Sequence, residues 1–182
     1  MKPTLNYVIA ECFIDTNLVQ TLLCKKGINH QNSCSKVIGT MNSKFKDNFA
    51  IGIIDKDKSG PKQLDQYEEF WHSDELTVCK HHTRPHYLVL INHVMESFII
   101  TCAAQSGLDL STHGLSSNLE ELKNLTKTTN SQEDKRFTNV FKTIVKDSID
   151  MKALQLILNY LVTNGYGATQ EGLKSILVQF PF

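Results

Sequence analysis

The stretch YVIAECFIDTNLVQTLL, residues 7–23, joins an apolar run, a carboxylate at its end and a helical pattern. Residues 7–10 are apolar and partly β-branched, which is typical of a short buried strand. Asp15 fits a helix N-cap, and the aliphatic residues at positions 18, 19, 22 and 23 then form one stripe. We therefore expect a buried strand that ends at Glu11 and a helix that follows directly.

The first half of the chain continues to alternate strand and helix patterns. A second apolar run, FAIGII at residues 49–54, ends in DKDKSGPK, which has the composition of a turn. The alternation predicts an α/β fold with a mostly parallel central sheet flanked by helices. The other expected elements are a very short strand at Ile28, helices over 37–45, 64–71 and 94–104, and strands over 75–81 and 87–91.

The last third of the chain shows helical patterns only. Residues 124–136 are polar and without a period, which predicts a loop or linker. Three amphipathic patterns follow, around Phe137, Leu154 and Leu173. We expect an α/β domain over residues 1–123 and a helical C-terminal subregion over 135–182 that packs on it.

Composition limits the classes of function. The chain has 182 residues, of which 41% are apolar, and equal numbers of basic and acidic residues, 19 of each. A neutral chain has no overall field that attracts nucleic acid, so such binding requires a local patch. Its five cysteines form no CxxC pair, and no apolar stretch has the pattern of a signal peptide or a membrane span. We expect a cytoplasmic protein that does not enter a membrane.

Carboxylates follow the two best strand patterns. Glu11 ends the first, and Asp55 and Asp57 follow the second, with Lys56 pointing away between them. If the two strands are parallel neighbours, the three carboxylates meet at one edge of the sheet, where ligands of α/β proteins bind. Clustered carboxylates repel unless a cation neutralises them, and Mg²⁺ prefers such oxygen ligands. Taken alone, Glu11 or the DKDK turn reads as solvated surface.

These motifs resemble those of the Toprim domain, which occurs in topoisomerases, bacterial primases and nucleases of phage defence. ECFID, with Glu11 and Asp15, is similar to the first Toprim motif, and AIGIIDKDK, with Asp55 and Asp57, to the second. Glu96 in HYLVLINHVMESFI takes the place of a further glutamate of defence-type members. The resemblance covers roughly residues 5 to 105. Cys12 departs from it, because the family has glycine there.

The resemblance implies a Mg²⁺- or Mn²⁺-dependent nuclease that cleaves phosphodiester bonds in DNA or RNA, with phage defence as one role. Glu11, Asp55 and Asp57 would be catalytic and would bind the metal together with Glu96. Asp15 would hold these ligands in position without binding the metal directly. The alternative is a non-catalytic Toprim-like module that binds a larger protein. The apolar end of the chain, SILVQFPF, would then contact that partner or a second copy.

A cluster of basic residues, CKHHTRPHY at 79–87, is the second candidate site. Lys80, His82, Arg84 and His86 could bind phosphate if they lie near the carboxylates. The alternatives are an exposed polar loop and a zinc site, although the spacing of Cys79 and the histidines matches no closed Cys/His site.

Overall fold

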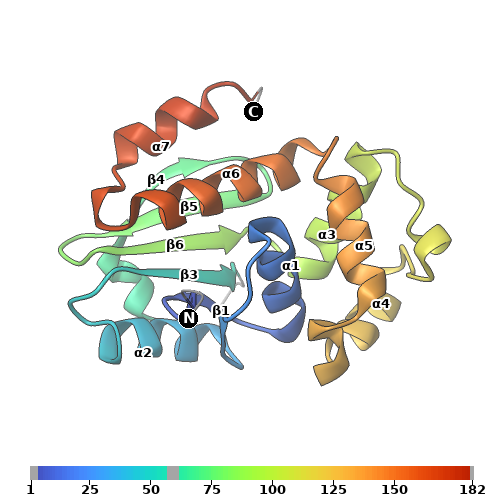
Figure 1. Cartoon of the computed structure of the whole chain (residues 1–182), viewed down its shortest axis with the longest axis horizontal. Helices are drawn as coiled ribbons and strands as arrows, with labels where there is room; N and C mark the ends of the chain where they lie inside the picture. The colour runs from blue at the N-terminus through green and yellow to red at the C-terminus, as the bar shows by residue number, and fades with distance from the viewer. Residues whose placement is uncertain (1–3, 57–61, 181–182) are drawn as a thin grey trace.

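The computed structural model describes residues 4–56 and 62–180, and its centre is a six-stranded sheet (Figure 1). The strand order is β2-β1-β3-β6-β5-β4; the first four strands are parallel, and β5 and β4 are antiparallel additions at one side. This confirms the predicted α/β fold with a mostly parallel sheet. The strands are β1 (Val8–Ala10), β2 (Asn29–His30), β3 (Ala50–Asp55), β4 (Tyr67–His72), β5 (Leu76–His81) and β6 (His86–Ile91).

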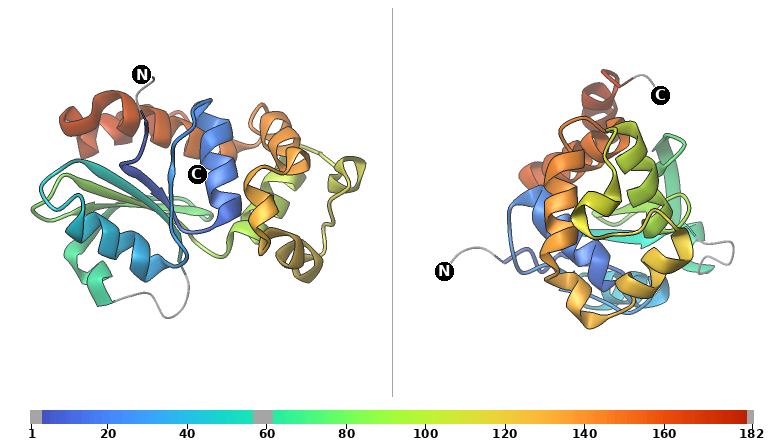
Figure 2. Two further views of the ribbon diagram at one scale, coloured as in Figure 1. Left: turned by 60° about the horizontal axis from the view of Figure 1, so that its bottom comes forward. Right: turned by 90° about the vertical axis from the view of Figure 1, so that its right-hand side faces the viewer.

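Helices cover both faces of the sheet and one of its edges. Helix α2 packs on one face, and α1, α6 and α7 lie on the other (Figure 1). The right-hand view in Figure 2 looks onto the carboxyl edge of the parallel strands, with α3, α4 and α5 in front of it. The α-helices described are α1 (Phe13–Leu23), α2 (Cys34–Ser43), α3 (Met95–Gln105), α4 (Leu119–Thr126), α5 (Lys135–Ile144), α6 (Ile149–Asn164) and α7 (Gln170–Leu177).

Two apolar cores form because side chains alternate across the strands. In β3, Ile51 and Ile53 face the core shared with α1, α5 and α6, whereas Ala50 and Ile54 face α2. Helix α2 comes very close to the sheet at Gly52. A Cβ built there would lie 2.6 Å from Leu88 Cδ2 and 2.8 Å from Met41 Sδ. The absence of a side chain at Gly52 therefore sets the spacing between β3 and α2.

Two predicted elements are wrong. Residues 64–71 form no α-helix: a 3₁₀ turn (Lys62–Gln66) leads into β4, which pairs with β5. Glu68 and Glu69 are exposed on this edge strand. The hydrophobic pattern of these residues fits a helix or a strand, and the pairing with β5 decides for the strand. Residues 124–136 are no plain linker either, because they contain the end of α4 and a second 3₁₀ turn (Thr129–Gln132).

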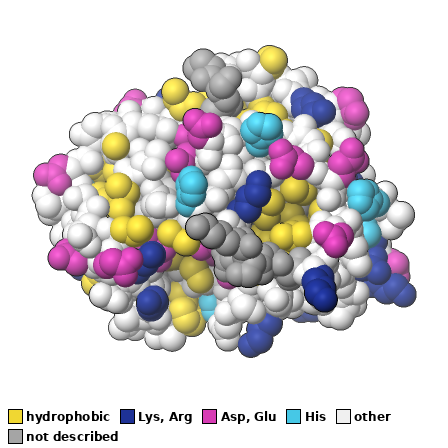
Figure 3. All heavy atoms as spheres, turned by 180° about the vertical axis from the view of Figure 1, so that it is seen from behind, with side chains coloured by type: hydrophobic (Ala, Val, Ile, Leu, Met, Phe, Trp, Pro, Cys, Tyr) yellow, Lys and Arg dark blue, Asp and Glu magenta, His cyan; other side chains and the backbone are white. Residues whose placement is uncertain are grey.

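The amphipathic patterns of the last third are confirmed. Their apolar residues are buried in α5, α6 and α7, and they join the core that contains α1 and α3. None of the described helices is long and apolar enough to cross a membrane. On the face shown in Figure 3, basic, acidic and histidine side chains are interspersed, as expected for a chain without net charge.

Candidate functional site at the carboxyl edge of the sheet

Parallel pairing of β1 with β3 brings two of the predicted carboxylates together. Ala10 is in register with Ile53, so Glu11, just beyond the end of β1, lies near Asp55, the last residue of β3. The backbone N–H of Asp55 donates to Glu11 Oε2 at 3.0 Å, and the N–H of Glu11 donates to the carbonyl of Ile53 at 3.1 Å. Glu11 is thus an ordered part of the strand end.

Asp15 has a different local role from the one predicted. The helix begins at Phe13 with Cys12 as its N-cap, so Asp15 is the third helical residue. Its Oδ2 accepts the backbone N–H of Cys12 at 3.0 Å, and its Oδ1 accepts the Cys12 thiol at 2.9 Å. This reach back to the cap residue is half of a capping box. Both Asp15 oxygens therefore already have a partner.

Asp55 is the least compensated carboxylate of the group. Its Oδ1 is buried and has no hydrogen-bond partner. Burial, then the charges of Asp15, Glu11 and Glu96, raise the pKa of Asp55 to about 8, against a smaller lowering effect of the Met95 backbone N–H. A buried carboxylate with one oxygen unpaired and other carboxylates nearby is unfavourable, and a proton or a cation would balance it.

Asp15 belongs to the same electrostatic group. It is only 1% exposed, and burial together with the charges of Glu11 and Glu96 raises its pKa to about 7, although its bonds with Cys12 act in the opposite direction. The carboxylates of Glu11, Asp15, Asp55 and Glu96 therefore interact electrostatically, although they come from α1, β3, α3 and the connection after β1. Asp57 lies outside the described residues.

Glu96 reaches this group from the first turn of α3 and is held from the opposite side. The hydroxyl of Thr126, at the end of α4, donates to Glu96 Oε1. Thr126 is 3% exposed, and its own carbonyl accepts the Ser131 hydroxyl at 2.9 Å. Thr126 could not be recognised in the sequence, because it lies within a polar stretch that resembles a linker.

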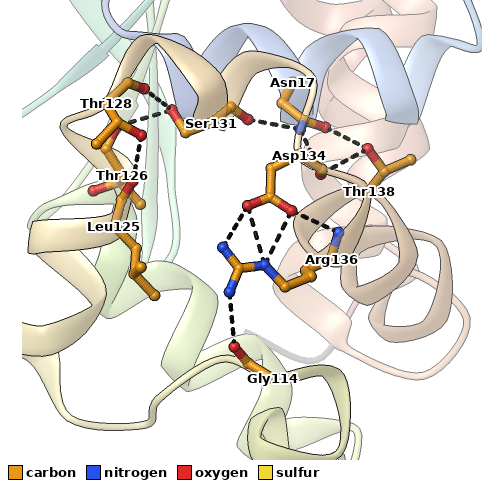
Figure 4. A network of polar contacts seen from close by, with 9 residues as sticks. All are labelled: Asn17, Gly114, Leu125, Thr126, Thr128, Ser131, Asp134, Arg136 and Thr138. Atoms are coloured by element: carbon orange, nitrogen blue, oxygen red, sulfur yellow. Dashed lines mark hydrogen bonds and ion pairs between the residues drawn. The ribbon is translucent and has the colours of Figure 1, made fainter.

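A polar network attaches the segment from Thr126 to Thr138, which we call the covering segment, to α1 (Figure 4). The Asn17 side-chain amide donates to the carbonyls of Ser131 at 2.9 Å and Asp134 at 3.2 Å, and Asn17 Oδ1 accepts the Thr138 hydroxyl at 3.0 Å. Arg136 pairs with Asp134 at 2.7 Å and reaches the Gly114 carbonyl. The residues that follow Thr126 are therefore attached to α1 at Asn17, which lies two residues after Asp15 on that helix.

The donor atoms fit a hard divalent cation, although they form no closed cage. Among residues 4–56 and 62–180, no group of three or more His, Cys, Asp and Glu side chains is arranged to hold a metal ion. Mg²⁺ differs from structural metals because it keeps several waters and is bound through one or two carboxylates. The buried, unpartnered Asp55 Oδ1 beside Glu11 meets that smaller requirement.

Cys12 is the departure from the resembled motif, and its thiol is chemically quiet. Burial, with the nearby carboxylates Asp15 and Asp55, raises the pKa of Cys12 far above its ordinary value. The thiol therefore stays protonated and donates to Asp15, so it offers no thiolate to attack a substrate. Its backbone N–H donates to the same carboxylate.

The basic candidates are not at this edge, so their expected proximity to the carboxylates is wrong. His86 begins β6 in register with Ala50, whereas Asp55 is in register with Ile91 at the other end. Because β5 runs antiparallel to β6, the turn between them lies at the amino end of β3. His86 is also fully buried and bonds the Phe45 carbonyl through Nε2 at 2.9 Å, so it cannot meet a phosphate.

The zinc interpretation of the same stretch finds no support, since Cys79, His81, His82 and His86 form no metal-binding group. No family model matches the chain, and no curated protein or solved structure is significantly similar to it. The function is therefore argued from the geometry of the chain itself.

Proposed function

We propose that the chain is a Toprim-like, Mg²⁺-dependent phosphodiesterase that acts on DNA or RNA at the carboxyl edge of its sheet. The observation that carries this proposal is Asp55 Oδ1, which is buried without a partner among carboxylates that raise its pKa. The parallel pairing of β1 and β3, which brings Glu11 to Asp55, supports a Toprim-like arrangement.

We assign a role to each of these residues from its hydrogen-bond partners. Asp55 and Glu11 would hold the cation, and Glu96 would complete its surroundings from α3, fixed by Thr126. Asp15 has both oxygens on Cys12, so it acts by orienting the turn between β1 and α1. A bound divalent cation supplies a site for phosphate oxygens and lowers the pKa of a bound water.

Protons take the place of the cation when it is absent. Burial and the neighbouring carboxylates raise the pKa of Asp55 and of Asp15, which favours the protonated form of both groups. Binding of a cation would release those protons, because a carboxylate ligand must be ionised. Proton release on binding is therefore an expected signature of this site.

The test is hydrolysis of single-stranded and double-stranded DNA and of RNA with Mg²⁺ or Mn²⁺, compared between wild type and Asp55→Asn. Glu68→Gln is the matched control, because Glu68 is an exposed carboxylate on β4. We expect metal-dependent cleavage by wild type and the control, and a loss of at least about 100-fold in Asp55→Asn. Absence of cleavage by all three proteins, or equal cleavage, would contradict the proposal.

The second candidate is the non-catalytic interaction module. The exposed apolar surface at the C-terminal end favours it, since Val178, directly after α7, is 84% exposed. In that case a protein partner or a second copy covers α7, and the acidic edge binds a cation without turnover. Cation binding without hydrolysis, together with association that is lost in Val178→Asp, would favour this candidate over the nuclease.

A further inference from the structure

A groove lies at the amino end of the sheet, opposite the acidic edge. It consists of two adjoining hollows of ≈ 290 and ≈ 410 Å³, which share Phe49, Gly165 and Tyr166. In Figure 1 this is the end of β3 and β6 near the turn from α6 to α7. We call it the basic-aromatic groove; the side chains that matter most are Lys44, Phe49, Lys80, His82, Arg84 and Tyr166.

Tyr166 is an exposed ring that is nevertheless held in place. It is 67% exposed, its hydroxyl donates to Asn48 Oδ1 at 3.1 Å, and its ring centroid lies 5.9 Å from that of Phe49. Gly165, at a φ of 51°, starts the turn, and the Tyr87 hydroxyl ties its far side by donating to the Ala168 carbonyl at 2.8 Å. Tyr166 therefore offers a preformed aromatic surface to solvent.

The end of β5 and the turn that follows it place Lys80, His82 and Arg84 beside this ring. Lys80 Nζ donates to the carbonyl of His81 at 3.2 Å and of Arg84 at 2.5 Å. His81 Nδ1 accepts the backbone N–H groups of Thr83 and Arg84, both at 3.1 Å. These bonds fix the path of the turn, so Lys80, His82 and Arg84 line the groove from a rigid backbone.

Donors remain available on these cations. An ammonium group has three N–H donors, and the two carbonyls use two of those of Lys80. A guanidinium has five, and one Arg84 nitrogen, Nη1, donates to Asn42 at 2.6 Å. Among the described residues, none that lines the two hollows is Asp or Glu. Burial lowers the pKa of Lys80, and a bound anion would reverse that effect.

We propose that the basic-aromatic groove binds a nucleoside phosphate, with the base on Tyr166 and the phosphate at Lys80, His82 and Arg84. A fixed aromatic face beside cations is how proteins bind the nucleotide unit without reading its sequence. The guanidinium group suits phosphate because it donates in parallel pairs. The two hollows together have the size of a small-molecule site.

The test is isothermal titration calorimetry of the full chain with AMP, adenosine and inorganic phosphate. We expect AMP to bind more tightly than either fragment, because only AMP occupies both parts of the groove. Titration with the single-stranded pentanucleotide dA5 distinguishes the two sources of this chemistry. Tighter binding of dA5 than of AMP indicates the unit of a strand, and the reverse order indicates a free nucleotide.

Two substitutions separate the halves of the groove. Tyr166→Ala should weaken AMP and adenosine about tenfold or more and leave phosphate unchanged, while Tyr166→Phe keeps the ring and the affinity. Arg84→Gln should weaken AMP and phosphate about tenfold and leave adenosine unchanged. Lys142→Gln, an exposed lysine on α5, is the control for general charge and should bind as wild type does.

The proposal does not depend on the acidic edge. Asp55→Asn should bind AMP as wild type does, even where cation-dependent cleavage is lost. AMP that fails to bind at millimolar concentration, or that binds Tyr166→Ala and Arg84→Gln as tightly as wild type, would overturn the inference. AMP binding that is lost only in Asp55→Asn would also overturn it, because the nucleotide would then sit at the acidic edge.

Discussion

The two ends of β3 carry opposite chemistry. Its carboxyl end, at Asp55, lies among the carboxylates of Glu11, Asp15 and Glu96. Its amino end, at Ala50, lies near the end of β5 and the turn after it, which supply Lys80 and Arg84. Ala50 and Asp55, the end residues of β3, lie five residue steps apart, or roughly 17 Å at about 3.3 Å per residue. Acidic groups thus gather near one end of β3 and basic groups near the other.

Strand direction accounts for the difference. Residues that follow parallel strands gather at the carboxyl edge, so Glu11 and Asp55 meet there. The β5–β6 hairpin is antiparallel, so its turn falls at the opposite edge. We propose that one edge of the sheet binds a cation and the other an anion, and each of the following predictions tests whether the two edges act separately.

The largest expected effect is a reciprocal loss of function. Asp55→Asn should abolish cation-dependent hydrolysis and keep AMP binding, whereas Arg84→Gln should weaken AMP binding and keep hydrolysis of a short model diester, bis(p-nitrophenyl) phosphate. The reason is that each substitution removes a charge from only one edge. Both activities are measured on the same protein samples, and a variant that loses both despite an unchanged melting curve would break the comparison.

Gly52→Ala tests the strand that joins the two edges. Its Cβ would lie 2.6 Å from Leu88 Cδ2 on β6 and 2.8 Å from Met41 Sδ on α2, so these neighbours must shift. We expect a loss of about 1–3 kcal/mol in the free energy of unfolding, measured by urea denaturation. Gly39→Ala on the exposed side of α2 is the control, since nothing lies within 4 Å of its Cβ, and should stabilise by up to about 1 kcal/mol. Equal effects would refute the packing argument.

The pH dependence of stability should report the acidic edge. The pKa values of Asp55 and Asp15 rise on folding from 3.8 to about 8 and about 7, so their favourable contribution is complete below about pH 4. It is lost progressively as the pH rises from about 4 through the folded pKa values, above which the carboxylates are ionised in both states. Without added metal, the stability of wild type relative to Asp55→Asn should therefore fall from pH 5 to pH 9.

Thermal melts of wild type and Asp55→Asn from pH 5 to pH 9 measure this change in relative stability. At pH 9, addition of Mg²⁺ should raise the melting temperature of wild type relative to that of Asp55→Asn. A difference that stays constant with pH would mean that Asp55 does not titrate as its surroundings indicate.

The smallest expected effect concerns the segment that covers the acidic edge. Thr126→Val keeps the shape of the side chain and removes the hydroxyl that donates to Glu96. We expect Mn²⁺ affinity to fall a few-fold, which corresponds to about 1 kcal/mol. Thr112→Val, at an exposed threonine, is the control. An unchanged Mn²⁺ affinity in Thr126→Val would show that Glu96 needs no support from α4.

Much of the fold could be predicted from local pattern. The strand that ends at Glu11, the strand that ends at Asp55 and the buried stripes of α5 and α6 follow directly from hydrophobic periodicity. The edge strand β4 could not, because YEEFWH is stabilised by its pairing with β5 and by the burial of Tyr67. Such long-range pairing leaves no period in the sequence.

The site was predictable only in part for the same reason. Glu11 and Asp55 follow strands, so topology alone predicts that they meet, but the support of Glu96 depends on Thr126, which lies 30 residues further along the chain. The basic turn shows the reverse case: its residues were recognisable, while its place depended on the antiparallel direction of β5. Cys12 lies where the resembled motif has glycine, and in the structure its backbone N–H and its thiol both donate to the Asp15 carboxylate.

The most direct test of the acidic edge is a Mn²⁺ titration followed by electron paramagnetic resonance and calorimetry. Wild type and Glu68→Gln should bind one Mn²⁺ with release of protons near pH 7, and Asp55→Asn should bind it at least about tenfold more weakly. Absence of Mn²⁺ binding to wild type, or equal binding to Asp55→Asn, would contradict the account.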